Sequence, residues 1–222
     1  MTRPKKSELT KAIEKAITWN HGGKMEGMIS LSTSPLVNEY CRKRSENDKL
    51  VCKHCFSMNL QKMRKELREK LLRNTDLLTS VIVPVDEMPL LNVAYFRLES
   101  FGDLQPGRKG EIQITNYFNL CNKNKHVSFA LWTKNPFVIA AAIKNGLKKP
   151  GNLIVIYSSP CLNTQIDIEK LVKVYPFIDK VFTVYDKDHA GNVEINCGAN
   201  HCMSCLKCYK KRTTKIIREK LK

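Results

Sequence analysis

The chain has 222 residues, and its hydrophobic fraction of 42% is enough to bury one sizeable core. It carries 38 Lys and Arg against 21 Asp and Glu, and the formal charge of +17 favours a polyanionic partner, nucleic acid first. The longest strongly apolar run, residues 137–143, is too short to cross a bilayer, and residues 1–10 lack the apolar run of a secretory signal. We therefore expect a cytoplasmic protein without a membrane partner.

Four predicted segments come first along the chain. Residues 7–18 have a serine at the N-cap position and apolar residues at helical spacing, which predicts a short amphipathic helix. Residues 27–35 alternate apolar and polar side chains up to a proline, which predicts a strand. A loop with three cysteines, residues 41–55, follows it. Residues 58–78 are rich in Leu, Lys, Arg, Glu and Met, which predicts a long helix.

Strand-like and helix-like segments alternate in the rest of the chain. The predicted strands are residues 80–86, 91–100, 126–136, 152–160 and 180–186. The predicted helices are residues 111–123, 137–146 and 166–175.

This alternation predicts a single α/β domain over residues 1–222, with a mainly parallel sheet or a partial (β/α) barrel. We expect its core in residues 24–196, with a Cys-rich loop after the first strand, and a C-terminal Cys-rich segment with a basic helix in residues 197–222. In such folds, functional side chains gather at the carboxyl ends of the strands. The polar residues at these predicted ends are Ser32, Thr33, Glu99, Asp103, Thr133, Lys134, Ser158, Ser159 and Asp186.

The C-terminal segment contains four closely spaced cysteines, Cys197, Cys202, Cys205 and Cys208. Thiols stay reduced in the cytosol, so clustered cysteines indicate a metal rather than a disulfide framework. The Cys-x2-Cys-x2-Cys run suits an iron–sulfur cube better than tetrahedral zinc, whose two Cys-x2-Cys pairs usually lie well apart. Zinc remains the alternative, and His201 is a second candidate ligand.

The N-terminal loop contains a second group, Cys41, Cys52 and Cys55, which we also interpret as metal ligands. The ten residues between the first two cysteines and the lack of a fourth leave two alternatives. Some of these cysteines could complete a site with the C-terminal group, or His54 could bind zinc beside Cys52 and Cys55.

The two remaining cysteines are weaker candidates. Cys121 lies in a predicted helix among apolar residues, where a buried cysteine packs as a small hydrophobic side chain. Cys161 follows a predicted strand end, from which it could face the site.

A set of polar residues at the strand ends is predicted to bind a ligand. These residues are Arg97, Glu99, Asp103, Lys134 and Ser158. Arg97 and Glu99 share parity on one predicted strand, so both are expected on one side of the sheet, where charged groups need a partner or a ligand. The alternative is an ion pair at an exposed edge. Lys134, with Trp132, could bind a phosphate or carboxylate group.

Several segments together carry a resemblance to known families. "CKHCFS", "RLESFGDL", "SFALWTKNP" and "NCGANHCMSCLKCY" resemble the gene product 88 family of phage and mobile elements, over residues 24–209. That family brings no established activity. A strand, a three-cysteine loop ending in "KHCF" and a helix are more distantly similar to radical S-adenosylmethionine enzymes, whose fold is a partial (β/α) barrel. The cysteine spacing is ten and two here rather than three and two, and no Gly-Gly-Glu is present.

The radical-enzyme similarity implies a role for each cysteine group. Cys41, Cys52 and Cys55 would bind three irons of a [4Fe-4S] cluster, and the fourth iron would chelate S-adenosylmethionine. The C-terminal cysteines would then hold a second, auxiliary [4Fe-4S] cluster.

Two functional interpretations follow. The first is an iron–sulfur protein with a radical-enzyme-like scaffold, two [4Fe-4S] clusters, redox or radical chemistry and an electron donor as partner. The alternative is a basic nucleic-acid-binding protein of a phage or mobile element, which binds through its surface and C-terminal helix and has structural or sensing iron–sulfur or zinc sites. No nucleophile elbow, Walker loop or dinucleotide-binding glycine motif is present.

Overall fold

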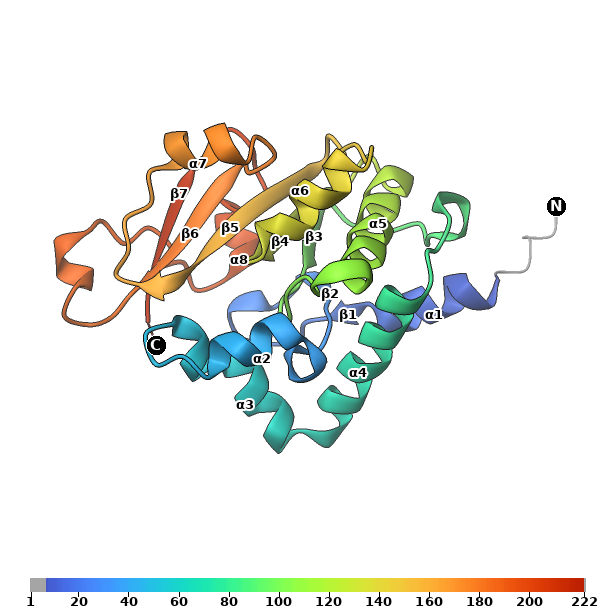
Figure 1. The fold of residues 1–222 in the computed structure, drawn as a ribbon, viewed down its shortest axis with the longest axis horizontal. Helices are drawn as coiled ribbons and strands as arrows, with labels where there is room; N and C mark the ends of the chain where they lie inside the picture. The colour runs from blue at the N-terminus through green and yellow to red at the C-terminus, as the bar shows by residue number, and fades with distance from the viewer. Residues whose placement is uncertain (1–6, 222) are drawn as a thin grey trace.

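A mostly parallel sheet lies at the centre of the computed structural model, which describes residues 7–221 (Figure 1). The strands are β1 (Thr18–Trp19), β2 (Ile29–Leu31), β3 (Tyr95–Leu98), β4 (Ser128–Thr133), β5 (Leu153–Leu162), β6 (Lys180–Tyr185) and β7 (Ile216–Lys220). They lie in the sheet in chain order, and only the β1–β2 pair is antiparallel. The α/β class and the mainly parallel sheet are confirmed.

Helices connect the strands, and α4, α5 and α6 cover one face of the sheet. They are α1 (Glu8–Ala16), α2 (Glu39–Ser45), α3 (Phe56–Met63), α4 (Lys65–Ser80), α5 (Gly107–Lys123), α6 (Pro136–Lys144), α7 (Ile168–Val174) and α8 (Cys202–Cys205). Helices α4, α5 and α6 pack side by side in chain order (Figure 1). Because the strands also follow chain order, successive crossovers advance in one direction along the sheet.

Alternation along the strands separates two hydrophobic cores. Phe96, Phe129 and Val155 belong to the core that packs under the helices, which we call the helix face. Trp132 and Ile154 belong to a smaller core on the opposite face. The second core includes Tyr209 from the C-terminal segment and, at its margin, Cys197, Cys202 and Cys208. We call this the cysteine face, because the C-terminal segment covers it.

Two predicted elements differ from the structure, and one strand was not predicted. The helix predicted over residues 58–78 is two helices, because Arg64 has an extended backbone (φ −118°, ψ 97°) that ends α3 before α4 begins. Residues 80–86 form no strand: Val83 is fully buried, and its N–H donates to the Asn116 side chain rather than to a neighbouring strand. The antiparallel strand β1 was not predicted.

The predicted basic C-terminal helix is also wrong, because residues 216–220 form strand β7. Ile216 and Ile217 are β-branched, and Ile217 is buried in the core of the cysteine face. The strand pairs in parallel with β6, with Val181 opposite Ile216. Tertiary pairing therefore overrides the helical preference of the lysines and glutamate around it.

Candidate functional site

The four C-terminal cysteines surround one small cavity against the cysteine face. Cys197, Cys202, Cys205 and Cys208 all line a space of about 20 Å³. The first lies in the loop after β6, two begin and end α8, and the last follows Leu206, whose left-handed backbone (φ 53°) ends the helix. This reversal brings the last cysteine of the run back to the same cavity. All four cysteines therefore line the same cavity.

The cavity limits what can occupy it. A water molecule needs a cavity of roughly 10–15 Å³, so this one has room for a single ion, whereas a four-iron cube requires the surrounding loop to move outward. Within residues 7–221, no three His, Cys, Asp or Glu side chains are placed closely enough to hold a metal ion. Either kind of centre therefore requires the thiols to turn toward one another. His201 also lines the cavity, so it remains an alternative ligand.

Two cations lie beside these thiols. Lys24 donates hydrogen bonds to Cys197 Sγ (3.2 Å) and Glu219 Oε1 (2.5 Å). Burial alone lowers the pKa of Lys24, but these bonds raise it above its ordinary value, so the amine stays charged. Burial raises the pKa of Cys208 to about 12, and the Arg97 charge offsets part of that rise. Burial also raises the pKa of Cys197 and of Cys202, so a metal that binds these thiols has to displace their protons.

The N-terminal cysteines gather at the carboxyl ends of the strands. Cys41 lies in α2, whose N-cap Asn38 accepts a hydrogen bond from the Cys41 N–H, and Cys55 is the N-cap of α3. The pKa of Cys41 is raised well above its usual value by burial, then by the charges of Asp103, Cys55 and Cys52. The charges of these groups therefore act on the Cys41 thiol, but among residues 7–221 no three such side chains are placed closely enough to hold a metal ion.

The other two cysteines have separate surroundings. Cys161 pairs through its backbone with Leu50, so the end of β5 is joined to the loop that carries Cys52 and Cys55. Cys121 is fully buried in the core of the helix face, and burial raises the pKa of its thiol well above its ordinary value. Its predicted role as a small hydrophobic side chain is consistent with that position.

Asp103 anchors the carboxyl ends of β3 and β4. Its carboxylate accepts hydrogen bonds from Thr133 Oγ1 (2.5 Å), the Lys134 N–H (2.8 Å) and the Leu104 N–H (2.7 Å). Burial raises the pKa of this carboxyl group, and the charge of Lys134 opposes the rise. The aspartate thus joins the strand ends to the site of Cys41, whose pKa it raises.

Glu99 lies in a buried network. It accepts hydrogen bonds from the Thr33 N–H (3.1 Å), from Gln113 Nε2 (2.6 Å) and from the Tyr117 hydroxyl. Burial raises its pKa from 4.5 to about 7. Sequence reasoning missed Gln113 and Tyr117, whose spacing of four residues on α5 was the available signal. Gly102 permits the close approach, since a Cβ there would lie 2.5 Å from Thr33 Oγ1 and 2.7 Å from Glu99 Oε2.

Arg97 and Glu99 do not keep the common orientation expected from their parity. Glu99 has a left-handed backbone (φ 56°), which ends the alternation of β3 after Leu98, and its carboxylate binds to side chains of α5. Arg97 instead lies over the Trp132 ring on the cysteine face, with its Cζ 3.9 Å from the ring centroid. Arg97 and Glu99, both among the described residues, do not form the ion pair that was the alternative expectation.

One larger cavity nevertheless brings the predicted ligand-binding residues together. It has a volume of about 280 Å³. The predicted residues lining it are Arg97, Glu99, Asp103, Lys134, Ser158, Cys197, Cys202 and Cys208. The cavity therefore lies between the C-terminal cysteines and the strand ends. The N-terminal cysteines do not line it, but Asp103 and Lys134, whose charges act on Cys41, do.

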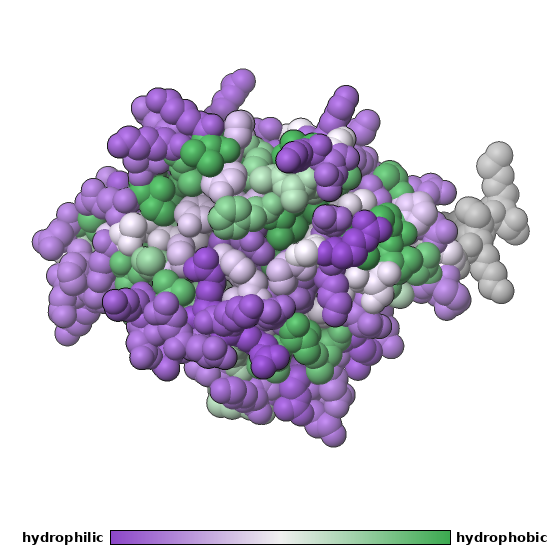
Figure 2. Space-filling view, in the orientation of Figure 1, coloured by the Kyte–Doolittle hydropathy of each residue, from purple (hydrophilic) through white to green (hydrophobic). Residues whose placement is uncertain are grey.

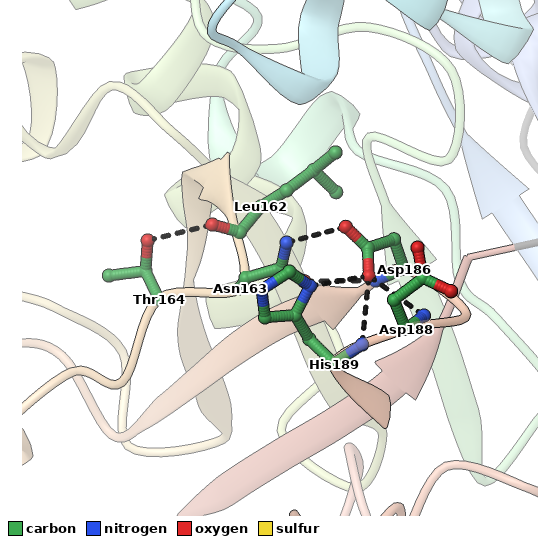
Figure 3. Close-up of polar contacts among 6 residues, drawn as sticks. All are labelled: Leu162, Asn163, Thr164, Asp186, Asp188 and His189. Atoms are coloured by element: carbon green, nitrogen blue, oxygen red, sulfur yellow. Dashed lines mark hydrogen bonds and ion pairs between the residues drawn. The ribbon is translucent and has the colours of Figure 1, made fainter. Parts of the chain in front are cut away.

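Asp186, also predicted at the strand ends, takes part in a separate network (Figure 3). Its carboxylate accepts hydrogen bonds from Asn163 Nδ2 (2.6 Å) and pairs with His189 Nδ1 (2.7 Å). The Asn163 side chain in turn accepts a hydrogen bond from the Asp186 N–H (3.0 Å). Bonds from Asn163 and His189 lower the pKa of Asp186 to about 2. This network ties the end of β5 to the loop after β6 and does not line the cavity.

The fold and the site define a class of α/β protein with a mostly parallel sheet, one face covered by helices and the other by a cysteine-rich segment. The chain belongs to the Gene product 88 family, whose sequence profile matches residues 4–220. No curated protein and no solved structure matches it. No helix in residues 7–221 is long and apolar enough to cross a membrane.

Proposed function

We propose that the protein is an iron–sulfur protein with a closed centre at the C-terminal cysteines and a second centre, with an open iron, at the N-terminal ones. The observation that carries the proposal is the convergence of Cys197, Cys202, Cys205 and Cys208 on one cavity. Four thiols from one short segment are a donor set for a cluster or for tetrahedral zinc. The successive Cys-x2-Cys spacing favours the cluster.

The arrangement of the second group supports the open centre. Cys41, Cys52 and Cys55 lie at the carboxyl ends of parallel strands, which is where α/β folds usually place their ligands. Three thiolates leave one iron of a four-iron cluster without a protein ligand. The singly wound sheet supports a scaffold like that of radical S-adenosylmethionine enzymes, with S-adenosylmethionine as the ligand of that iron. Such a centre supplies one-electron chemistry.

The first experiment measures iron, zinc and acid-labile sulfide per chain in protein purified without oxygen, with an electron paramagnetic resonance spectrum after reduction. We expect about eight irons and eight sulfides for two cubes. Cys202→Ala and Cys52→Ala should each lose the signal of one centre. Cys121→Ala, which removes a buried thiol outside both groups, is the matched control and should retain both.

Two further outcomes are informative. S-adenosylmethionine should change the spectrum of Cys202→Ala but not that of Cys52→Ala, if the open iron lies at the N-terminal group. Zinc without sulfide would contradict the iron–sulfur proposal and leave a zinc-binding protein.

A second candidate function is nucleic-acid binding, favoured by the residues after the last cysteine. Lys210, Lys211, Arg212 and Lys215 are exposed in the loop between Cys208 and β7. Figure 2 shows hydrophilic residues over much of the visible face. A polyanion that neutralises these cations would release counterions, so binding should weaken steeply with salt. The K210Q/K211Q/R212Q variant should lower the slope of log affinity against log salt concentration by about three, while K62Q/K65Q/K109Q, with three exposed cations elsewhere, should not.

A further inference from the structure

Two buried polar atoms without a hydrogen-bond partner belong to residues at one cavity. These are the Nε of Arg97 and the Oγ of Ser100, and neither makes a hydrogen bond within residues 7–221. Both residues line the cavity of about 280 Å³. Buried polar groups in folded proteins are nearly always paired, so two such atoms around one cavity point to a ligand.

The positive charge of Arg97 has no negatively charged partner within the described residues. Its Nη1 lies 3.3 Å from the Met25 sulfur, which is a weak acceptor, and its guanidinium stacks on the Trp132 ring. No carboxylate among residues 7–221 lies within ion-pairing distance of it. The planar guanidinium donates two parallel hydrogen bonds to a carboxylate or a phosphate. The free donor set is therefore one that recognises an anion.

The other charges at the cavity favour a single negative charge on that anion. The charged residues that line it are Lys24, Arg97, Lys134, Glu99, Asp103 and Glu219. Lys24 and Glu219 neutralise each other at 2.5 Å. Glu99 and Asp103 are already hydrogen bonded to protein groups, and any charge they carry would repel a doubly charged phosphate more strongly than a carboxylate.

The remaining walls are largely apolar. Phe101, Trp132, Phe182 and Met25 line the same cavity. A ligand site of this kind combines apolar and aromatic walls with a few polar groups that fix the orientation. We propose that the cavity binds a small organic monocarboxylate, whose carboxylate is held by Arg97 and Ser100 and whose apolar body lies against Trp132 and Phe182. This inference goes beyond the metal centres, because the binding needs no metal.

Trp132 provides a direct measurement. The chain has two tryptophans, and Trp19 is 52% exposed on β1, so Trp19→Phe leaves the fluorescence of Trp132 alone. The probe is benzoate, with benzamide as its neutral counterpart and inorganic phosphate as the doubly charged competitor. We expect benzoate to change the Trp132 fluorescence saturably and to bind at least about tenfold more tightly than the other two.

Two variants identify the contacts, each with a matched control. Arg97→Gln and Ser100→Ala should each weaken benzoate binding by about tenfold, as loss of a hydrogen bond to a charged group predicts. Arg108→Gln removes an exposed arginine and Ser80→Ala an exposed serine, and both should bind benzoate as the parent does. All titrations are run on protein as purified and again after chelation.

Three outcomes would overturn the proposal: no saturable change with benzoate, equal binding of benzamide, or unchanged binding by both Arg97→Gln and Ser100→Ala. Arg97→Gln could alter the metal content without altering benzoate binding, while Ser100→Ala binds benzoate normally. That result would mean that the Arg97 guanidinium compensates the charge of the cysteine thiolates, and the proposed carboxylate site would be wrong. Benzoate binding that survives chelation supports this inference whatever the metal analysis gives. The failures of the two proposals are thus distinguishable.

Discussion

The Nζ atom of Lys24 lies 3.2 Å from the Sγ atom of Cys197, although the two residues are 173 positions apart in the chain. The same amine pairs with Glu219 on β7 at 2.5 Å. One cation from the loop before β2 thus holds the first cysteine of the C-terminal group against the last strand. The position of this thiol depends on a residue at the other end of the chain.

Removal of this amine should destabilise the protein. Lys24→Met leaves the Glu219 carboxylate and the Cys197 carbonyl, both partly buried, without their donor. We expect the free energy of unfolding to fall by about 1–3 kcal/mol, measured by urea denaturation. Lys11→Met, which removes an exposed lysine paired with Glu8, is the control and should change it by less than about 0.5 kcal/mol. Equal losses in the two variants would contradict the anchoring role of Lys24.

Gly102 should tolerate no side chain. In Gly102→Ala the Cβ would lie 2.5 Å from Thr33 Oγ1 and 2.7 Å from the Thr33 carbonyl oxygen, so backbone must move. We expect a loss of about 1–3 kcal/mol in the free energy of unfolding. Gly151→Ala, where nothing lies within 4 Å of the added methyl group, is the matched control. A Gly102→Ala protein as stable as the control would show that the contact between Gly102 and Thr33 relaxes without cost.

Glu99 should make the stability depend on pH. Burial raises its pKa from 4.5 to about 7, so the folded protein holds this proton more tightly than the unfolded chain does. Its contribution is complete below pH 4.5 and is lost as the pH rises through about 7, a difference of about 3 kcal/mol. Burial also raises the pKa of the neighbouring Asp103, which adds a contribution of the same sign.

Urea denaturation between pH 5 and pH 8 measures the Glu99 contribution. Glu99→Gln should be less stable than the wild type at pH 5, because its amide nitrogen is a donor that faces the donors of Thr33 and Gln113. The free energy of unfolding of this variant should change less with pH than that of the wild type. Glu111→Gln, on the partly exposed side of α5, should keep the wild-type slope. A wild-type stability that rises from pH 5 to pH 8 has the wrong sign for this explanation.

If the C-terminal cysteines hold a metal as proposed, its removal should loosen the cysteine face in a defined region. Cys202 and Cys208 pack at the margin of the core that contains Tyr209 and Ile217. We expect chelation to increase amide hydrogen exchange over residues 197–220 while α5, on the other face, stays protected. Exchange that increases uniformly would mean that the metal stabilises the whole fold, and unchanged exchange would place the metal elsewhere.

The sequence predicted the elements whose local signals agree with their packing. The Ser7 N-cap of α1 and the strand β4 appear where they were expected. Local signals failed where a distant partner decides the structure. The lysines near residue 216 favour a helix, but pairing with β6 makes a strand. The parity of Arg97 and Glu99 failed because the left-handed backbone at Glu99 cannot be read from alternation.

The candidate site was predictable in composition but not in geometry. Cysteine spacing identified the set that lines the small cavity. The role of Lys24 and the partnership of Gln113 with Glu99 depend on segments that the fold brings together from far apart. The spacing of Gln113 and Tyr117 places both on one face of α5, but no local pattern identifies Glu99 as their partner.

The cysteine segment is also the connection between β6 and β7. Parallel neighbours need a crossover, which elsewhere in this sheet contains a helix packed on the helix face. Here the crossover runs over the opposite face, and it is the segment that carries the four cysteines. Strand β7 can therefore cover the edge of β6 only after the last of those cysteines has been synthesised. Until β7 has paired, one edge of β6 has unpaired backbone groups, which is the kind of edge at which chains associate.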